Sequence, residues 1–180
     1  MRELTGRTKS FIYVYVILMG FFHLYTAIFG SFEAFLQRAI HLSWVLPLGF
    51  LLYPATGNCP KDRIPLYDWG LALLAALPGL YLAVNFTAVA TRIVQVDPVS
   101  TVQIGLAFLL VLLLMEGTRR VVGLPLALIA AFFAGYMHFG HLLPGIMKGL
   151  SFSIPEVAEQ LFLTDEGIYS IPLGVSATFV

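Results

Sequence analysis

Long apolar runs, separated by short polar stretches, occupy most of this sequence. Residues 11–30 form a run of about 20 residues, the length at which a helix crosses a hydrocarbon core about 30 Å thick. Four more runs follow, each bounded by charges, glycine or proline: residues 41–55, 66–86, 102–115 and 121–139. A backbone in lipid must satisfy its own hydrogen bonds, and these runs lack the period-two alternation of barrel strands. The sequence therefore predicts an all-α integral membrane protein with about five transmembrane helices.

The amino-acid composition points to lipid rather than water as the main surrounding. Hydrophobic residues make up 59% of the 180 residues and charged residues only 11%, whereas about a quarter of the residues in soluble domains are charged. The net charge of +0 excludes the basic surface that a nucleic-acid-binding protein needs. Membrane lipid is therefore an expected partner, and nucleic acid is not.

Two stretches between the runs have the pattern of short amphipathic helices that lie along the membrane interface. In residues 31–40 the apolar side chains share one face and the polar ones face the other way: Phe32, Phe35, Leu36 and Ile40 against Glu33, Gln37 and Arg38. In the second stretch, Ser153 is expected to cap a helix with Pro155 in its first turn. Packing on neighbouring protein would explain both stretches equally well, and the sequence leaves this open.

Lysine and arginine are distributed unevenly between the two sides of the predicted bundle. Seven of the ten basic residues fall on one side if successive runs alternate in direction: Arg2, Arg7, Lys9, Lys61, Arg63, Arg119 and Arg120. Arg38, Arg92 and Lys148 fall on the other side. Because cytoplasmic loops carry the excess of basic residues, we expect a cytoplasmic amino terminus and an external loop at residues 140–170.

The end of the sequence, residues 171–180, opens another apolar run after the polar TDEG. This run stops before it is long enough to cross a bilayer. A chain that ended inside hydrocarbon would leave its last carbonyl groups unsatisfied. We therefore expect the start of a sixth helix that is cut off, in a truncated product or in one part of a longer protein.

The four histidines predict no metal site. His138 and His141 have a spacing that puts both imidazoles on one helix face, but no cysteine or carboxylate nearby completes a ligand set. His23 lies inside the first run, where a polar side chain is costly unless it faces other helices or a cavity. It has two interpretations, a packed histidine with one hydrogen bond or a proton or polar relay. A haem would need a second histidine well inside another run.

Charged residues gather between the fourth and fifth runs in the stretch EGTRRVVGLP. Glu116, Arg119 and Arg120 have the i,i+3 and i,i+4 spacings that favour ion pairs, here in a cytoplasmic turn. The break at residues 123–125 would then restart the next helix. A discontinuous helix that lines a site would show the same pattern, so both interpretations stay open.

The sequence contains no motif that would support catalysis. It has no serine–histidine–acid set, no glycine-rich phosphate loop and no CxxC motif. Asp68, beside Tyr67 and Trp69, suits anchoring of the third helix at the membrane interface rather than catalysis. The single cysteine, Cys59, cannot form an internal disulfide. We therefore do not expect an enzyme, nor an ATP-driven pump within this chain.

Several stretches resemble a known transporter family. LLVLLLMEGTRRVVGLPLALIAAFF (109–133), LPG (143–145) and LTDEGIYSIPLGVSATFV (163–180) are similar to the fused permeases of tripartite ATP-independent periplasmic (TRAP) transporters. The similarity is to the branch served by TAXI-type solute receptors, and it covers the carboxy-terminal part of the chain. The first three runs fit the family only by their pattern and by YDW at 67–69.

The resemblance implies an amino-terminal fragment of such a permease, in the inner membrane of a bacterial or archaeal cell. Residues 1–100 would be like the small membrane subunit, with three spans, and residues 101–180 would begin the large transport subunit. In that family an ion gradient, usually sodium, drives uptake. The expected partners are a periplasmic solute receptor, the rest of the large subunit and a small-molecule solute, with carboxylates as the expected class. Sodium is a candidate coupling ion, and no cofactor is expected.

Gly174, Ser176 and Thr178 are the residues that we expect to line a transport path. Small side chains permit close backbone approach, and hydroxyl groups offer oxygen ligands. Ordinary helix packing would use the same residues. Two other functions also fit the sequence. One is a scaffold subunit that binds only other membrane proteins, and the other is a membrane-embedded haem or redox protein that uses His23 and His138.

Overall fold

The computed structural model describes residues 1–57 and 59–179, so Val180, the last residue of the final apolar run, lies outside it. The described residues form helices and loops, with no strand among them. Five helical segments are long and apolar enough to cross a membrane: α1 (Gly6–Phe29), α2 (Ala34–Leu52), α3 (Leu66–Val84), α5 (Thr101–Val121), and α6 (Leu124–Phe139) together with the turn that continues it to Leu142. The predicted all-α fold with five apolar helices of spanning length is confirmed.

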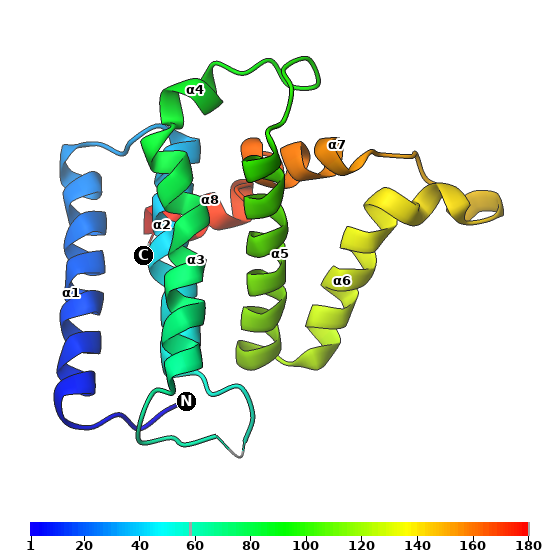
Figure 1. Ribbon diagram of the computed structural model, residues 1–180. Helices are drawn as coiled ribbons and strands as arrows, with labels where there is room; N and C mark the ends of the chain where they lie inside the picture. The colour runs from blue at the N-terminus through cyan, green and yellow to red at the C-terminus, as the bar shows by residue number, and fades with distance from the viewer. Residues whose placement is uncertain (58, 180) are drawn as a thin grey trace.

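The long helices stand side by side, with α2, α3 and α5 in the centre and α1 and α6 at the two outer edges (Figure 1). The core lies between the three central helices, where Phe50, Leu82 and Leu110 are at most 1% exposed. α2 and α3 share the most extensive contact. A Cβ atom placed on Gly79 of α3 would lie 2.6 Å from the carbonyl oxygen of Ala39 of α2. Glycine therefore allows the two backbones to approach closely.

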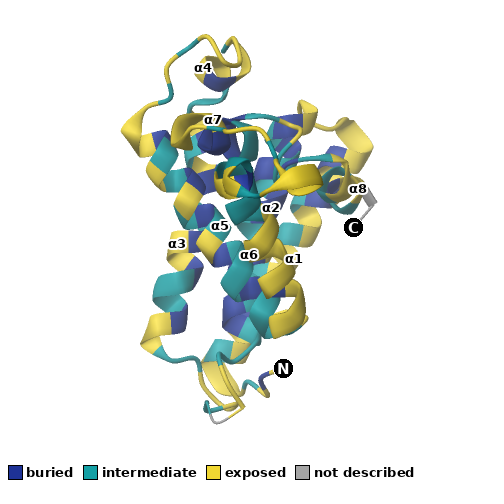
Figure 2. Ribbon diagram, turned by 90° about the vertical axis from the view of Figure 1, so that its right-hand side faces the viewer, coloured by how far each residue is buried: buried dark blue, intermediate teal, exposed yellow. Residues whose placement is uncertain are grey.

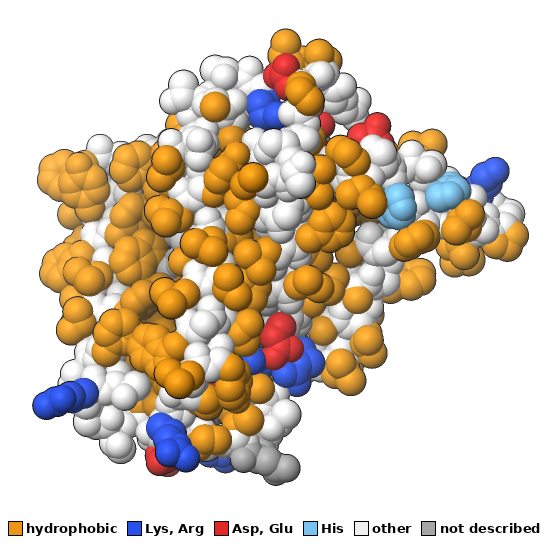
Figure 3. All heavy atoms as spheres, viewed as in Figure 1, with side chains coloured by type: hydrophobic (Ala, Val, Ile, Leu, Met, Phe, Trp, Pro, Cys, Tyr) orange, Lys and Arg blue, Asp and Glu red, His pale blue; other side chains and the backbone are white. Residues whose placement is uncertain are grey.

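The outward faces of α1 and α6 are apolar and exposed. Only 17% of the most apolar stretch of α1 and 11% of that of α6 are buried, and exposed residues run along both helices (Figure 2). A hydrophobic band covers the middle of the molecule, while lysine and arginine lie toward the two ends of the helices (Figure 3). These are the features of a multi-pass membrane protein whose middle is covered by lipid.

The amino terminus, the loop between α2 and α3 and the turn between α5 and α6 lie at the same end of the bundle (Figure 1). These segments carry the basic residues that the sequence assigns to one side. At the turn, α5 ends at Val121, and α6 starts at Leu124 with Pro125 in its first turn. Gly123 adopts a φ of 126°, a conformation that favours glycine. The break at residues 123–125 is therefore a tight turn between two spans, not the interior of a discontinuous helix.

Residues 31–40 do not form a separate interfacial helix, contrary to the expectation from sequence. Most of them are the first turns of α2, which the Glu33 carboxylate caps by accepting from two backbone N–H groups at 2.9 and 3.2 Å. Gln37 does not face outward either, since only 4% of it is exposed. Its side-chain amide donates to Thr26 of α1. A contact with another helix thus decides the orientation of Gln37, and no local pattern contains that information.

The second expected short helix is present as α7 (Ile154–Ala158). Ser153 and Glu156 cap it reciprocally. The Ser153 N–H donates to the Glu156 carboxylate at 2.6 Å, and the Glu156 N–H donates to the Ser153 hydroxyl at 3.4 Å. Val157 is buried, and α7 contacts α5. One face of this short helix therefore packs on neighbouring protein.

The remaining elements connect and cover the bundle away from the amino terminus: α4 (Phe86–Ala90), the turns η1 (Gly140–Leu142) and η2 (Gly145–Met147), the π-helical segment η3 (Glu159–Leu163) and α8 (Ile171–Phe179). The Glu159 carboxylate accepts from Arg92 at 2.8 Å and from the Gln95 N–H at 3.0 Å, which ties η3 to the loop before α5. α8 packs against α2. This last contact joins the second long helix of the bundle to the last helix that the structure describes.

Candidate functional site

Three polar side chains form a hydrogen-bonded row between α1, α2 and α8. His23 of α1 and His41 of α2 are 5% and 1% exposed, and Nε2 of His23 lies 2.8 Å from Nδ1 of His41. Nε2 of His41 lies 3.2 Å from the hydroxyl of Ser176 in α8. Nδ1 of His23 lies 2.8 Å from the carbonyl oxygen of Met19. We name His23, His41 and Ser176 the histidine row.

The Met19 carbonyl group fixes the direction of every hydrogen bond in the row when both imidazoles are neutral. A carbonyl oxygen only accepts, so Nδ1 of His23 carries the hydrogen and Nε2 of His23 is left as an acceptor. His41 must then donate from Nδ1, which leaves its Nε2 to accept from the Ser176 hydroxyl. The donor-to-acceptor order therefore runs from Ser176 to Met19, and every imidazole nitrogen in the row is satisfied.

Thr26 and Gln37 extend this polar region between α1 and α2. The Thr26 hydroxyl donates to the backbone carbonyl oxygen of His23 at 3.0 Å and accepts from Gln37 Nε2 at 3.2 Å. The amide oxygen of Gln37 is buried and has no hydrogen-bond partner among the residues described. A buried acceptor without a donor costs about 1–3 kcal/mol. Gln37 thus offers an acceptor to any donor group that enters between the two helices.

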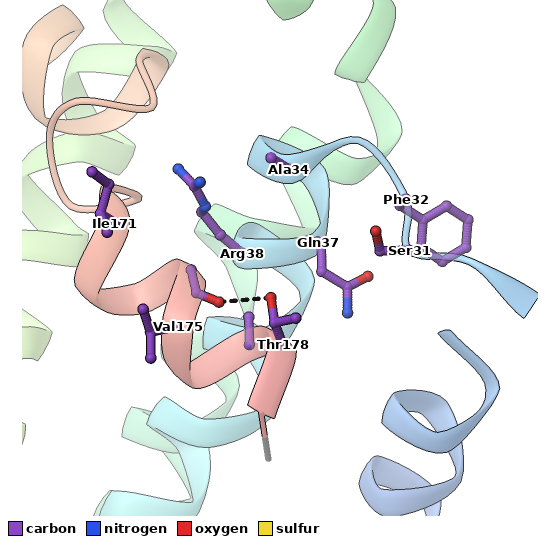
Figure 4. Close-up of a pocket in the computed structure, with 10 residues that line it drawn as sticks. Ser31, Phe32, Ala34, Gln37, Arg38, Ile171, Val175 and Thr178 are labelled. Atoms are coloured by element: carbon purple, nitrogen blue, oxygen red, sulfur yellow. Dashed lines mark hydrogen bonds between the residues drawn. The ribbon is translucent and has the colours of Figure 1, made fainter. Parts of the chain in front are cut away.

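A pocket of about 320 Å³ opens between the start of α2 and α8 (Figure 4). Gln37 and Arg38 line it from α2, and Gly174 and Thr178 line it from α8. The two neighbouring α2 side chains diverge: Arg38 points toward the segment before α8, and Gln37 points toward the loop between α1 and α2 (Figure 4). Nη1 of Arg38 donates to the carbonyl oxygen of Tyr169 at 2.8 Å. This bond holds the guanidinium group at the edge of the pocket.

The residues expected to line a transport path have two different positions. Gly174 lines the pocket, and a Cβ atom there would lie 2.7 Å from Nε of Arg38, so glycine makes room for this side chain. Thr178 also lines the pocket, but its hydroxyl donates to the carbonyl oxygen of Gly174 at 2.9 Å. Ser176 lies in the histidine row instead. His41 is the residue that connects Ser176 with His23.

A second polar cluster lies at the amino-terminal end of the bundle. Asp68 of α3 is fully buried and forms ion pairs with Arg2 and with Nη1 of Arg120, the latter at 2.6 Å. Glu116 pairs with both Arg119 and Arg120 at 2.7 Å, at the i,i+3 and i,i+4 spacings seen in the sequence. These five residues, named here the charge cluster, join the amino terminus to α3 and α5.

The charge cluster corrects the interpretation of Asp68 as an interfacial anchor. The Asp68 carboxylate is removed from solvent, and a buried charge is tolerated only when it is paired. One of its partners, Arg2, precedes it by 66 residues, so the pairing has no local signal. Nη1 of Arg2 also donates to the carbonyl oxygens of Phe50 and Leu51 at 3.0 and 2.9 Å. The cluster therefore holds three segments together and leaves Asp68 no free face for a ligand.

The two neighbouring histidines belong to neither polar cluster. Nδ1 of His138 donates to the carbonyl oxygen of Phe152 at 2.7 Å, and Nδ1 of His141 donates to that of His138 at 2.9 Å. α6, which carries His138, and α1, which carries His23, lie at opposite edges of the bundle (Figure 1). The two histidines named for a redox protein are therefore separated by the central helices.

Cys59 lies in the loop between α2 and α3. Its Sγ atom is 3.3 Å from the Thr56 hydroxyl and 3.3 Å from the Tyr67 hydroxyl. The hydrogen bond from Thr56, followed by that from Tyr67, stabilises the thiolate and lowers the pKa of Cys59 to about 7. The thiol is therefore more acidic than an ordinary cysteine, which raises its reactivity near neutral pH.

His41, Gln37 and Arg38 are site residues that the sequence analysis did not identify as such. The second apolar run begins at His41, which placed this histidine at a boundary rather than inside a helix. The available signal was the four-residue spacing of Gln37 and His41, which puts both on one helix face. Ser176, the partner of His41, follows it by 135 residues. Only the folded arrangement brings them together.

No known protein family, curated protein or solved structure matches this chain. The resemblance to TRAP permeases therefore rests on the quoted sequence stretches alone. The histidine row and the pocket beside it are the features of the described residues whose chemistry bears on function.

Proposed function

We propose that this chain is a membrane component of a secondary-active transporter that takes up organic acids, is driven by an ion gradient and works with a periplasmic solute receptor. The observation that carries the proposal is the pocket between α2 and α8, which Arg38 lines and beside which the histidine row joins the same two helices through His41 and Ser176. Polar and ionisable groups are costly at membrane depth, and they commonly mark solute or ion pathways.

The chemistry of the pocket suits a small carboxylate. Arg38 offers a planar guanidinium group that can bind a carboxylate through two parallel hydrogen bonds. No acidic side chain is among the described residues that line the pocket. Its volume of about 320 Å³ lies at the lower end of the range for ligand sites, about 300–1,000 Å³. These properties favour an organic acid of few atoms over a cation or a large solute.

In this proposal, residues 1–100 act as the small membrane subunit and residues 101–180 begin the large transport subunit. The chain lies in the inner membrane of a bacterial or archaeal cell with its amino terminus in the cytoplasm. The contacts that join the parts include the packing of α2 against α8 and of α3 against α5, and the ion pair between Asp68 and Arg120. The exposed faces of α1 and α6 meet lipid or the rest of the large subunit. Sodium is the coupling ion that the resemblance implies.

Uptake of labelled organic acids tests this function. Membrane vesicles containing the chain, the rest of the large subunit and the receptor are assayed with and without a sodium gradient. Arg38→Gln is expected to lower uptake by about tenfold or more, the loss of a charge-assisted hydrogen bond. Arg38→Lys should recover part of it, because lysine keeps the charge but not the planar fork.

Arg63→Gln is the matched control for Arg38→Gln. Arg63 is an exposed arginine in the loop between α2 and α3, and its loss should leave uptake unchanged. The proposal fails if Arg38→Gln and Arg63→Gln support the same uptake, or if no organic acid is taken up under any ion gradient.

A scaffold subunit is the second candidate function, and the exposed apolar faces of α1 and α6 favour it. Phe132 and Phe133 of α6 are 57% and 61% exposed, so they are available for contact with another membrane protein. If the chain is a scaffold, replacing both by alanine releases a co-purifying membrane protein, while Arg38→Gln has no effect on uptake. The opposite pair of results would favour the transporter.

A further inference from the structure

The hydrogen bond between His23 and His41 limits how many protons the two imidazoles can hold. In the neutral row, Nδ1 of His41 carries the hydrogen and Nε2 of His23 accepts it at 2.8 Å. One added proton fits, because either imidazole can be the charged one while a single hydrogen stays between the rings. A second proton would put two N–H groups head to head over the same 2.8 Å. The pair of neutral imidazoles can therefore take up one additional proton but not two.

The two ends of the histidine row differ in whether they can exchange protons with water. At the His23 end, Nδ1 donates to the carbonyl oxygen of Met19, a group that does not pass protons on. At the opposite end, the Ser176 hydroxyl belongs to a residue that is only partly buried, on the helix that also lines the pocket. A hydroxyl group can accept one proton and release another. Exchange with water is therefore possible through Ser176 and not through Met19.

We propose that His23 and His41 form a binding site for a single proton, which enters and leaves through Ser176. A hydronium ion gives its proton to Oγ of Ser176 and becomes water. The original O–H bond of Ser176 breaks as that hydrogen moves to Nε2 of His41. The Nδ1–H bond of His41 can then break as its hydrogen moves to Nε2 of His23. One positive charge is gained, no electrons are transferred, and Ser176 changes from hydrogen-bond donor to acceptor.

The charged and titratable side chains around the row do not compete for this proton. They include Tyr15 and Tyr25 of α1, Glu33 and Arg38 of α2, and Tyr169 before α8. α3, which packs against α2, adds Tyr67, Asp68 and Tyr81, and the described part of α8 adds none. The Tyr15 hydroxyl donates to a backbone carbonyl at 3.0 Å, and the Glu33 carboxylate caps α2. No carboxylate in the described ranges hydrogen-bonds to either imidazole. The fixed charge of Arg38, one turn before His41, further disfavours a second proton.

The coupling role of this proton rests on the proposed transport function, whereas its binding does not. In a transporter, the row makes the proton a coupling ion in place of sodium or beside it. α8 carries both Ser176 and the pocket residues Gly174 and Thr178, so proton loading and solute binding act on the same helix. The change of Ser176 from hydrogen-bond donor to acceptor is the physical link between proton loading and solute binding.

Nitrogen NMR of the chain labelled with ¹⁵N-histidine in lipid nanodiscs tests the proton site. At pH values above the protonation transition, both His23 and His41 should carry hydrogen on Nδ1. On acidification from about pH 8 to about pH 4, their signals should move together and account for one proton in total. His141→Gln is the matched control and should leave this joint transition unchanged. Two separate one-proton transitions, hydrogen on Nε2 at high pH, or no transition would overturn the proposal.

Variants of Ser176 test the entry route without removing an imidazole. Ser176→Ala should slow proton exchange between the pair and water by about tenfold or more, while Ser176→Thr, which keeps the hydroxyl, should not. Equal exchange rates in the two variants would exclude this route. In vesicles, uptake driven by sodium but not by a proton gradient would remove the coupling role and leave the proton site intact. Absence of any uptake would instead remove the proposed transport function.

Discussion

Asp68 of α3 and Arg120 of α5 form an ion pair at 2.6 Å, with side chains that are 0% and 2% exposed. The other carboxylate oxygen of Asp68 binds Arg2, so one buried negative charge faces two positive ones. Glu116 adds a second negative charge by accepting from Nε of Arg120 at 2.7 Å. The pair thus belongs to a network whose members depend on one another for neutralisation.

Replacing Asp68 by alanine is expected to destabilise the protein by about 3–5 kcal/mol, because the buried guanidinium group of Arg2 loses its counter-charge and that of Arg120 loses one of two. Thermal unfolding of the purified protein in detergent measures the change. Asp62→Ala is the control, since Asp62 is exposed in the loop between α2 and α3; it should alter stability by about 0.5 kcal/mol or less. Equal unfolding temperatures for the two variants would contradict the burial of the charge cluster.

Gly79→Ala should destabilise the contact between α2 and α3. The new Cβ atom would lie 1.7 Å from the Ser43 hydroxyl and 2.6 Å from the carbonyl oxygen of Ala39, and the backbone atom cannot move away alone. Overpacking of this kind costs about 1–3 kcal/mol. Gly70→Ala on the same helix meets no atom within 4 Å and serves as the control. A Gly79→Ala protein as stable as the Gly70→Ala protein would show that the helices are farther apart.

Gly174→Ala should lower the uptake of organic acids more than it lowers the stability of the protein. The added Cβ atom would lie 2.7 Å from Nε of Arg38, and a flexible arginine side chain can move aside at the loss of its hydrogen bond to Tyr169. We expect uptake of organic acids to fall by about tenfold, with a change in stability of about 1 kcal/mol or less. Gly135→Ala in α6, where a Cβ atom meets nothing within 4 Å, is the control. Unchanged uptake would argue against a role for Arg38.

Alkylation of Cys59 should follow the lowered pKa of its thiol. Because Thr56 and Tyr67 stabilise the thiolate and bring the pKa to about 7, the reaction rate with iodoacetamide should rise through about pH 7. Thr56→Val removes the larger contribution and should shift this rise to higher pH. Tyr67→Phe should shift it in the same direction by less. A rate profile that is the same in Thr56→Val and in the parent would contradict the assigned hydrogen bonds.

The sequence was sufficient to predict the long helices and the turns between them. Apolar runs in lipid can satisfy their backbone only as helices, and the ends of α1, α3, α5 and α6 lie within about six residues of the ends of the predicted runs. The capping of α7 by Ser153 and the ion pairs of Glu116 were also accessible, because their partners are three or four residues away. Contacts between residues three or four positions apart can be predicted from their spacing in a single sequence.

The sequence was not sufficient for the buried polar contacts. Residues 31–40 look amphipathic, but the side of α2 that faces α1 and α8 is determined by partners far along the chain. His41 and Ser176 are 135 residues apart, and Arg2 and Asp68 are 66 apart. Periodicity shows that a helix has two faces, yet it does not say which other helix each face meets. The pairing of His23 with His41 was missed for this reason.

The position of Arg2 also bears on how the protein is made. During synthesis Arg2 leaves the ribosome early, but its partner Asp68 follows 66 residues later and Arg120 later still. Neither Asp68 nor Arg120 has therefore been made when α1 follows Arg2 out of the ribosome. Packing of the segment around Arg2 against Leu52 and Asp68 is then a late step of biogenesis, because it requires α3 and α5 to be in place.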